Sequence, residues 1–272
     1  VDNCPDLPNG SQTNLDGDEY GDACDDDNDG GTIDHVLAFQ AGFNLISFYA
    51  IPEDSLVGNV LSPLGDNAVS LLGEGVAATN TDNGWLGSLT HIEHDAGYWL
   101  FVNEAATLSL TGYPIQPDQN YALIEGFNLI SYPFLDCGSI DEVLPDSIEN
   151  CTSAILGEGY ASINTENGWL GGLQTLCPDD GYWFTSLCDI DFTFDEPASL
   201  ARKQILSPSP YPYNQSSLQA FYFIESVENI ELDDWILAYN GNIIIGARQW
   251  TGDMIDVPAM GDAGNSLTAG YI

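Results

Sequence analysis

The side chains best suited to chemistry lie in the first 35 residues, and their chemistry is the binding of a hard cation. Residues 14–18 (NLDGD) put an oxygen-bearing side chain at every second position, with glycine where the backbone must turn. Residues 25–30 (DDDNDG), followed by Asp34, repeat this spacing in an EF-hand-like form that lacks the closing glutamate. Calcium takes about six to eight oxygen ligands of these kinds. Because the segment has too few apolar residues to fold by burying them, we expect bound calcium to order it.

Cysteine, proline and glycine have characteristic places in the same segment. The strings DNCP (residues 2–5), GDACD (residues 21–25) and DxDG (residues 27–30) together resemble a thrombospondin type 3 repeat. In that family, acidic residues wrap calcium ions along an irregular chain that disulfides cross. The resemblance implies calcium as the cofactor and a disulfide between Cys4 and Cys24. The ligands that it implies are Asn14, Asp16, Asp18, Asp22, Asp25, Asp27, Asp29 and Asp34.

The rest of the chain carries no catalytic signature. His91 and His94 are spaced to face one side of a helix, but no HExxH zinc motif is present. The GxSxG nucleophile elbow and the GxxxxGK[ST] phosphate loop are also missing, and no GxGxxG stands between a strand and a helix. Glu74 and Glu158 occupy the two occurrences of the sequence LGEG, where a structural role fits better than catalysis. We therefore expect a protein that is not an enzyme.

The charge balance restricts the class of partner. Asp and Glu number 42 against 3 Lys and Arg, a formal net charge of −39. Nucleic-acid binding needs a basic face, so the composition excludes it. Docking on anionic lipid needs a polybasic segment, and the lack of one argues against such docking. No apolar run reaches the roughly 18 residues of a membrane span. Since 44% of the residues are hydrophobic, we expect folded cores beneath an acidic surface.

The six cysteines favour disulfides over zinc, because no CxxC or CxxH pair occurs. Disulfides in turn favour an oxidising, extracellular location. Besides Cys4 and Cys24, the simplest pairing is Cys137 with Cys151 and Cys177 with Cys188, although the sequence leaves other pairings open. The sequence begins at Val1 without a methionine, which predicts a processed chain or the ordered part of a longer one.

Residues 36–197 contain two copies of one domain, predicted at residues 36–116 and 117–197. Four motifs recur at one constant spacing, which we call the repeat offset: FNLIS at 43 and 127, LGEG at 72 and 156, NGWLG at 83 and 167, and GYW at 97 and 181. A unit of this length can bury its own core, unlike a solenoid repeat. Runs of β-forming residues between Asn-Gly turns predict a small β-sandwich or barrel, with short helical turns at residues 54–61 and 140–144.

Four tryptophans recur in these copies. Trp99 and Trp183 are expected in the cores. Trp85 and Trp169 directly follow the Asn-Gly turns, and packing at the turn and contact with a glycan are both open for them.

A Ser/Pro-rich stretch at residues 198–217 predicts a stiff linker, and residues 218–272 predict a smaller β-domain with a hairpin at Asn240-Gly241. The strings DDWILAYNG and GARQW resemble a domain of long secreted bacterial proteins. Another strand is expected after Tyr271 and Ile272. We therefore expect either that the protein continues or that another chain completes this domain.

These features predict a mainly β protein that is secreted, binds calcium and serves as a structural subunit of an extracellular fibre, matrix or surface assembly. Self-association is expected through the N-terminal arm (residues 1–35) or through an open β-edge. The alternative is a cell-surface adhesin or carbohydrate-binding module in which Trp85 and Trp169 contact glycans. A third hypothesis is an ancillary module of a secreted hydrolase.

Overall fold

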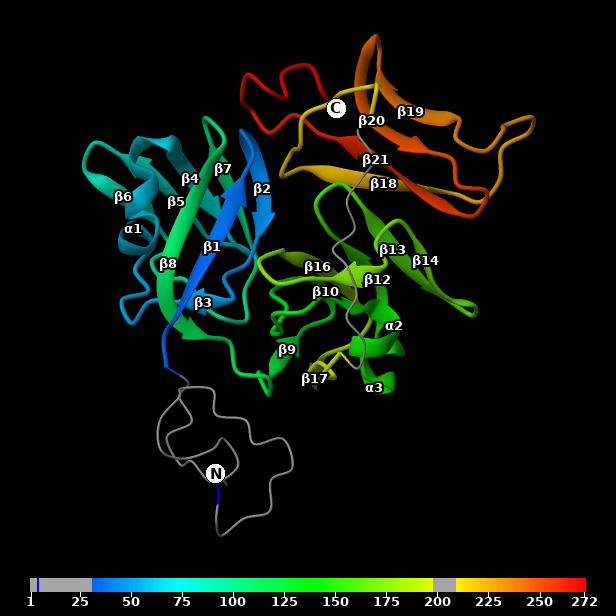
Figure 1. Ribbon diagram of the computed structural model, residues 1–272. Coiled ribbons are helices and arrows are strands. Elements are labelled where there is room, and N and C mark those ends of the chain that lie inside the picture. Colours follow the sequence, from blue (N-terminus) through cyan, green and yellow to red (C-terminus); the bar gives the residue numbers. More distant parts are fainter. Residues whose placement is uncertain (1–3, 5–30, 198–208) are drawn as a thin grey trace.

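The structure is a computed structural model that describes Cys4, residues 31–197 and residues 209–272 (Figure 1). The fold is mainly β, as predicted. Three groups of strands follow one another along the chain, which we call copy 1 (residues 31–116), copy 2 (residues 117–197) and the C-terminal unit (residues 209–272). No helix in these described ranges is long and apolar enough to cross a membrane.

Copy 1 combines a five-stranded antiparallel sheet of order β2-β7-β4-β5-β6 with a three-stranded sheet of order β1-β8-β3. Its first strand begins at Ile33, within the range predicted for the acidic arm. The strands are β1 (Ile33–Phe39), β2 (Gly42–Ile46), β3 (Ala50–Ile51), β4 (Ala68–Leu72), β5 (Ala77–Thr81), β6 (Gly84–Gly87), β7 (Tyr98–Val102) and β8 (Ala106–Pro114), with helix α1 at Val57–Val60 and the 3-10 helix η1 at Ser62–Asn67.

Copy 2 has the same five-stranded order, β10-β16-β12-β13-β14. Each strand of this sheet begins one repeat offset after its counterpart in copy 1. Two small ladders, β17-β9 and β11-β15, accompany it. The elements are β9 (Tyr121–Leu123), β10 (Gly126–Ile130), β11 (Gly138–Ser139), α2 (Ile140–Val143), α3 (Asp146–Glu149), β12 (Thr152–Leu156), β13 (Ala161–Thr165), β14 (Gly168–Gly171), β15 (Thr175–Leu176), β16 (Tyr182–Ser186) and β17 (Ile190–Phe192).

The two sheets of copy 1 share one apolar core. In β8, exposed and buried positions alternate from Thr107 to Pro114, so one face of the strand turns inward. Leu37 and Leu108 from the smaller sheet join Leu71 and Leu100 from the larger sheet in the same cluster. A corresponding cluster fills copy 2. Each copy is thus a layered β arrangement, and no barrel is closed among the described strands.

The asparagine of each FNLIS motif fixes the turn that leads into its strand. The side chain of Asn44 accepts a hydrogen bond from the Gln40 backbone N–H at 2.8 Å, and that of Asn128 accepts one from the Ile124 N–H at 2.9 Å. Both asparagines are buried. Because a buried polar group must be hydrogen-bonded, this contact explains why the motif carries an amide inside an apolar string.

The predicted turns and helices are present. Gly84 and Gly168 have φ angles of 91° and 89°, which glycine adopts without strain. They close the hairpins β5-β6 and β13-β14. The helical turns predicted near residues 54–61 and 140–144 correspond to α1 and α2.

The C-terminal unit contains two antiparallel ladders. One pairs β18 (Gln219–Ile224) with β21 (Ile255–Met260), and the other is the predicted hairpin of β19 (Trp235–Asn240) and β20 (Ile243–Gln249). Gly241, with φ 60°, lies in the hairpin turn. A Cβ at Gly246 would lie only 1.6 Å from the Pro258 carbonyl oxygen. The two ladders therefore pack with their inner strands in close backbone contact.

Candidate functional site

Asp34 is the predicted calcium ligand that falls in the described ranges. It lies in β1 opposite Thr111, and its carboxylate accepts a 2.6 Å hydrogen bond from the Thr111 hydroxyl. Asp34 is exposed. The described residues contain no group of three or more His, Cys, Asp and Glu side chains arranged to hold a metal. The other predicted ligands, Asn14, Asp16, Asp18, Asp22, Asp25, Asp27 and Asp29, lie outside the described residues, as does Cys24, the expected partner of Cys4.

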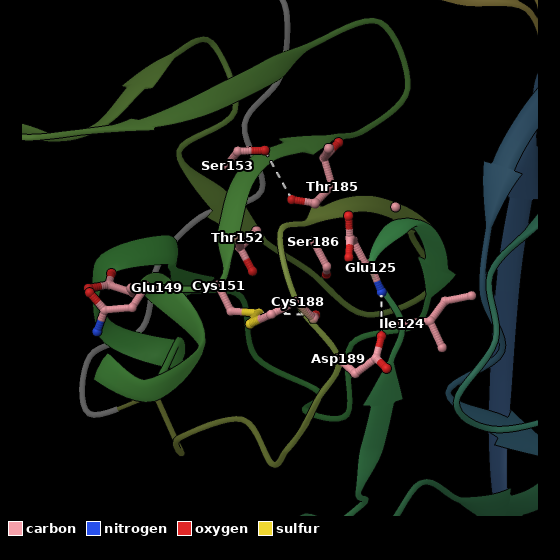
Figure 2. The surroundings of a disulfide bond; sticks show 12 residues. Ile124, Glu125, Glu149, Cys151, Thr152, Ser153, Thr185, Ser186, Cys188 and Asp189 are labelled. Atoms are coloured by element: carbon pink, nitrogen blue, oxygen red, sulfur yellow. Dashed lines mark hydrogen bonds between the residues drawn. A yellow bond between two sulfur atoms is a disulfide. The ribbon is translucent and has the colours of Figure 1, made fainter.

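The disulfides of copy 2 differ from the simplest predicted pairing. Cys137 bonds to Cys177. Cys151 bonds to Cys188, as Figure 2 shows. Strand register explains both bonds. Gly138 pairs with Leu176 in the β11-β15 ladder, so the next position outward places Cys137 opposite Cys177. Thr152 pairs with Ser186 in the β12-β16 ladder, so Cys151 and Cys188 flank the end of that ladder. The predicted pairs Cys137–Cys151 and Cys177–Cys188 were wrong because nearness in sequence does not decide which strands are neighbours.

Copy 1 has hydrogen bonds at the two positions that are equivalent to one disulfide of copy 2. Asn67 and Glu104 occupy in copy 1 the positions that Cys151 and Cys188 occupy in copy 2. The Asn67 side chain donates to the Glu104 carbonyl at 3.0 Å and accepts from the Glu104 N–H at 2.9 Å. The same two positions are therefore tied together in both copies, by an amide in one and a covalent bond in the other.

The two copies bind each other through an interface whose backbone contacts are symmetric. Each backbone hydrogen bond between the copies has a counterpart in which the two copies change places, which is the arrangement of an isologous interface. Four backbone bonds of 2.8 to 3.2 Å form two such pairs: Ser47 N–H to Asp179 C=O with Ser131 N–H to Asp95 C=O, and Gly97 N–H to Leu129 C=O with Gly181 N–H to Leu45 C=O.

The glutamates of the two LGEG motifs complete this interface. The Leu129 N–H donates to the Glu74 carboxylate at 2.9 Å, and the Leu45 N–H donates to the Glu158 carboxylate at 2.8 Å. Each glutamate thus satisfies a backbone donor of the edge strand in the other copy. The leucines themselves are buried with Phe43 and Trp99 in one cluster between the sheets.

The glycine of each GYW motif permits the close approach. A Cβ at Gly97 would lie 2.8 Å from the Leu129 side chain and 3.0 Å from the Ile130 carbonyl. A Cβ at Gly181 would lie 2.6 Å from the Ile46 carbonyl. Three of the repeated motifs, FNLIS, LGEG and GYW, therefore contribute to one surface, where the copies bind each other.

A cavity of about 530 Å³ opens beside this interface, between β1 and β2 of copy 1 and two turns of copy 2. Asp179, which lines the cavity, also contacts His35, whose Nε2 lies 2.6 Å from one carboxylate oxygen and 2.7 Å from the other. Burial raises the pKa of the Tyr160 phenol in this cavity, and the nearby Asp180 and Glu158 carboxylates add to the effect. His35, Asp179 and Glu158 are all engaged in contacts between the copies.

The C-terminal unit docks on copy 2 through a buried ion pair. Arg248 Nη2 lies 2.8 Å from Asp256 Oδ2, and Asp256 is fully buried. The pair also binds the LGEG turn, because Arg248 donates to the Gly159 carbonyl at 2.6 Å and Asp256 accepts from the Ala161 N–H at 2.8 Å. Burial raises the pKa of Asp256 above its ordinary 3.8, while Arg248 and the backbone donors act in the opposite direction.

A residue difference between the copies lies where Asp256 docks on copy 2. Gly172 faces Asp256, and a Cβ at this position would lie 2.2 Å from Asp256 Oδ1. Copy 1 carries Ser88 at the equivalent position, and the Ser88 hydroxyl accepts the Ala77 N–H at 3.2 Å. In copy 1 the serine therefore bonds the backbone donor that corresponds to the one Asp256 bonds in copy 2.

The two candidate glycan contacts have different surroundings. Trp169 is 6% exposed and its indole N–H donates to Glu149 in α3 at 3.1 Å. It has no open ring face on which a sugar can stack. Trp85 is half-buried in a groove of about 230 Å³ that Asn59 and Thr90 also line. Copy 1 has Gly65 at the position of Glu149, so its tryptophan lacks the same cover.

Sequence reasoning missed the docking residues. Arg248 and Asp256 lie far from copy 2 in sequence and carry no motif of a binding site. The usable signal was the exchange of Ser88 for Gly172 next to the repeated NGWLG motif, since loss of a side chain in one copy marks a place where another backbone or side chain approaches.

Comparisons with known proteins gave no relative: no family model, no curated protein and no solved structure matches this chain.

Proposed function

We propose that the chain is a secreted, calcium-binding structural protein that forms part of an extracellular fibre, matrix or surface assembly. The two disulfides of copy 2 suit an oxidising compartment. The acidic arm would bind calcium through the ligands implied by its resemblance to a thrombospondin type 3 repeat, and Asp34 would stand where the arm enters β1.

The main support for this proposal is that the buried and interfacial polar side chains bind one β unit to another. Glu74 and Glu158 each satisfy a backbone donor of the other copy, and Arg248 with Asp256 joins the C-terminal unit to copy 2. These groups hold the β units together instead of converging on a reacting centre. Such a body suits a load-transmitting subunit, and calcium on the arm would reduce the repulsion between molecules of charge −39.

Two measurements on the whole chain test the proposal. Titration calorimetry should show calcium binding, and electron microscopy should show extended assemblies in calcium that disperse when a chelator is added. Magnesium at the same concentration is the control for simple charge screening. Particles that stay monomeric at high calcium would argue against the assembly role, and the absence of calcium binding would remove its basis.

The groove beside the half-buried Trp85 supports an adhesin or carbohydrate-binding module as the second candidate. Its groove combines an aromatic ring with the polar side chains of Asn59 and Thr90, a combination that suits a neutral sugar. A glycan array with the intact chain, Trp85→Ala and Trp169→Ala tests it. Binding that is lost only in Trp85→Ala would favour the adhesin. No glycan binding by the intact chain would reject it.

A further inference from the structure

The two outer strands of the C-terminal unit carry more apolar side chains than the structure covers. β18 reads QAFYFI and β19 reads WILAYN, yet none of their twelve residues is buried. The inner strands differ, because four residues of β20 and all six of β21 are buried. Apolar residues on both faces are typical of strands that are covered on both sides. The sequences of β18 and β19 thus fit a unit with one more layer or strand than this chain provides in its described residues.

A groove of about 260 Å³ separates these outer strands. The four consecutive residues 236–239 of β19 line it. Because successive side chains of a strand point to opposite faces, lining by consecutive residues means that β19 presents its edge to the groove. Tyr222 and Ile224 of β18 form the other wall. Among the described strands, β18 pairs only with β21 and β19 pairs only with β20, so neither outer strand has a partner on its second edge.

The charge beside the groove restricts its occupant. Residues 225–234, which join β18 to β19, contain Glu225, Glu228, Glu231, Asp233 and Asp234 and no cationic side chain. The groove itself is lined by apolar and tyrosine side chains. An occupant with acidic side chains would be repelled by the connection. An occupant that is merely apolar would leave the strand edges without hydrogen-bond partners.

We propose that this groove accepts one extended β-strand from a partner polypeptide, with alternating apolar side chains and no acidic residues, which pairs with the free edges of β18 and β19. This is recognition by strand addition. The inference deepens the proposed assembly function, on which it rests for the identity of the partner as a neighbouring subunit. Binding of a strand to the groove can be measured without any assembly.

The test uses the full chain and a synthetic peptide, acetyl-KVTVTVTVK-amide, and measures binding by calorimetry and by the change in the tryptophan fluorescence of the chain. A second peptide of the same sequence has N-methyl groups at alternate backbone nitrogens, so it keeps its side chains but cannot complete a ladder. We expect binding of the first peptide and at least about a tenfold loss of affinity for the second. Equal binding of the two peptides, or no binding of the first, would overturn the proposal.

Variants locate the site. Tyr222 and Tyr239 are 57% and 53% exposed, so Tyr222→Ser with Tyr239→Ser should leave the fold intact while weakening peptide binding about tenfold. Leu86→Ser, at a similarly exposed apolar position on β6 of copy 1, is the matched control and should bind as the unchanged chain does. A loss of binding in the control alone would place the peptide elsewhere and refute the groove.

Calcium separates this inference from the proposed function. Peptide binding with no calcium-dependent assembly would support the acceptor groove and count against the structural role. Assembly in calcium without any peptide binding would support the structural role and overturn the acceptor groove.

Discussion

Serine in place of Gly172 should release the C-terminal unit from copy 2. The new Cβ would lie 2.2 Å from Asp256 Oδ1 and 3.0 Å from its Cγ. Asp256 cannot move aside without loss, because its Oδ2 is held at 2.8 Å by both Arg248 and the Ala161 N–H. Separating a buried ion pair costs about 3–5 kcal/mol, a large share of the roughly 5–15 kcal/mol that stabilises a typical domain.

Urea denaturation followed by tryptophan fluorescence measures this effect, since the C-terminal unit contains Trp235 and Trp250. We expect Gly172→Ser to show an early transition and faster proteolysis between copy 2 and the C-terminal unit. The control is Ser88→Gly, which makes copy 1 resemble copy 2. It removes only the Ser88 to Ala77 bond at an exposed site and should cost about 1 kcal/mol. If Gly172→Ser lost no more stability than Ser88→Gly, the docking geometry described above would be wrong.

Three further predictions concern the interface, the disulfides and pH. Glu74→Ala and Glu158→Ala should each destabilise the chain by about 1–3 kcal/mol, because each leaves one leucine N–H of the other copy unpaired. The two losses should be similar, and glutamine at either position should recover most of the lost stability in thermal unfolding. Replacing Cys151 and Cys188 by serine should cost about 4 kcal/mol in the chain-entropy view, since that bond spans 37 residues; non-reduced peptide mapping should find Cys137 joined to Cys177, and a Cys137–Cys151 peptide would contradict the strand register. Burial raises the pKa of Asp256, so the folded state binds the proton of this carboxyl group more tightly than the unfolded chain does. The stability due to Asp256 is therefore largest below about pH 4 and declines as the pH rises through the raised pKa. The difference in unfolding free energy between the intact chain and Asp256→Asn should follow this decline, and a difference that grew with pH would disprove it.

Local patterns in the sequence predicted the elements well. The Asn-Gly pairs at residues 83–84 and 167–168 lie at the hairpins that they predicted. The β19-β20 hairpin and the short helices α1 and α2 are also at their predicted places. These features depend on neighbours in sequence, where glycine conformation and apolar alternation act directly.

Contacts between distant residues were beyond reach for a physical reason. Nothing in the string LGEG indicates that Glu74 binds the Leu129 N–H, because that bond depends on how two complete sheets face each other. The burial of Trp169 depends on Glu149 in a helix whose counterpart in copy 1 has a different shape. Cysteine spacing likewise misled, since the strand register placed Cys137 beside Cys177.

The C-terminal unit binds the two copies unequally, so the molecule has two different ends. A molecule made only of the two equivalent copies would have a twofold rotation axis. Molecules with that symmetry tend to associate through like surfaces, which gives closed assemblies. The C-terminal unit contacts the two copies through different residues, since the buried Arg248–Asp256 pair binds copy 2 while Ala263 packs against the apolar cluster that includes Phe43 of copy 1. Figure 1 shows the start of β1 and the C-terminal unit at opposite ends of the molecule. A single contact repeated between such molecules joins unlike surfaces, and it yields a ring or a filament whose two tips differ.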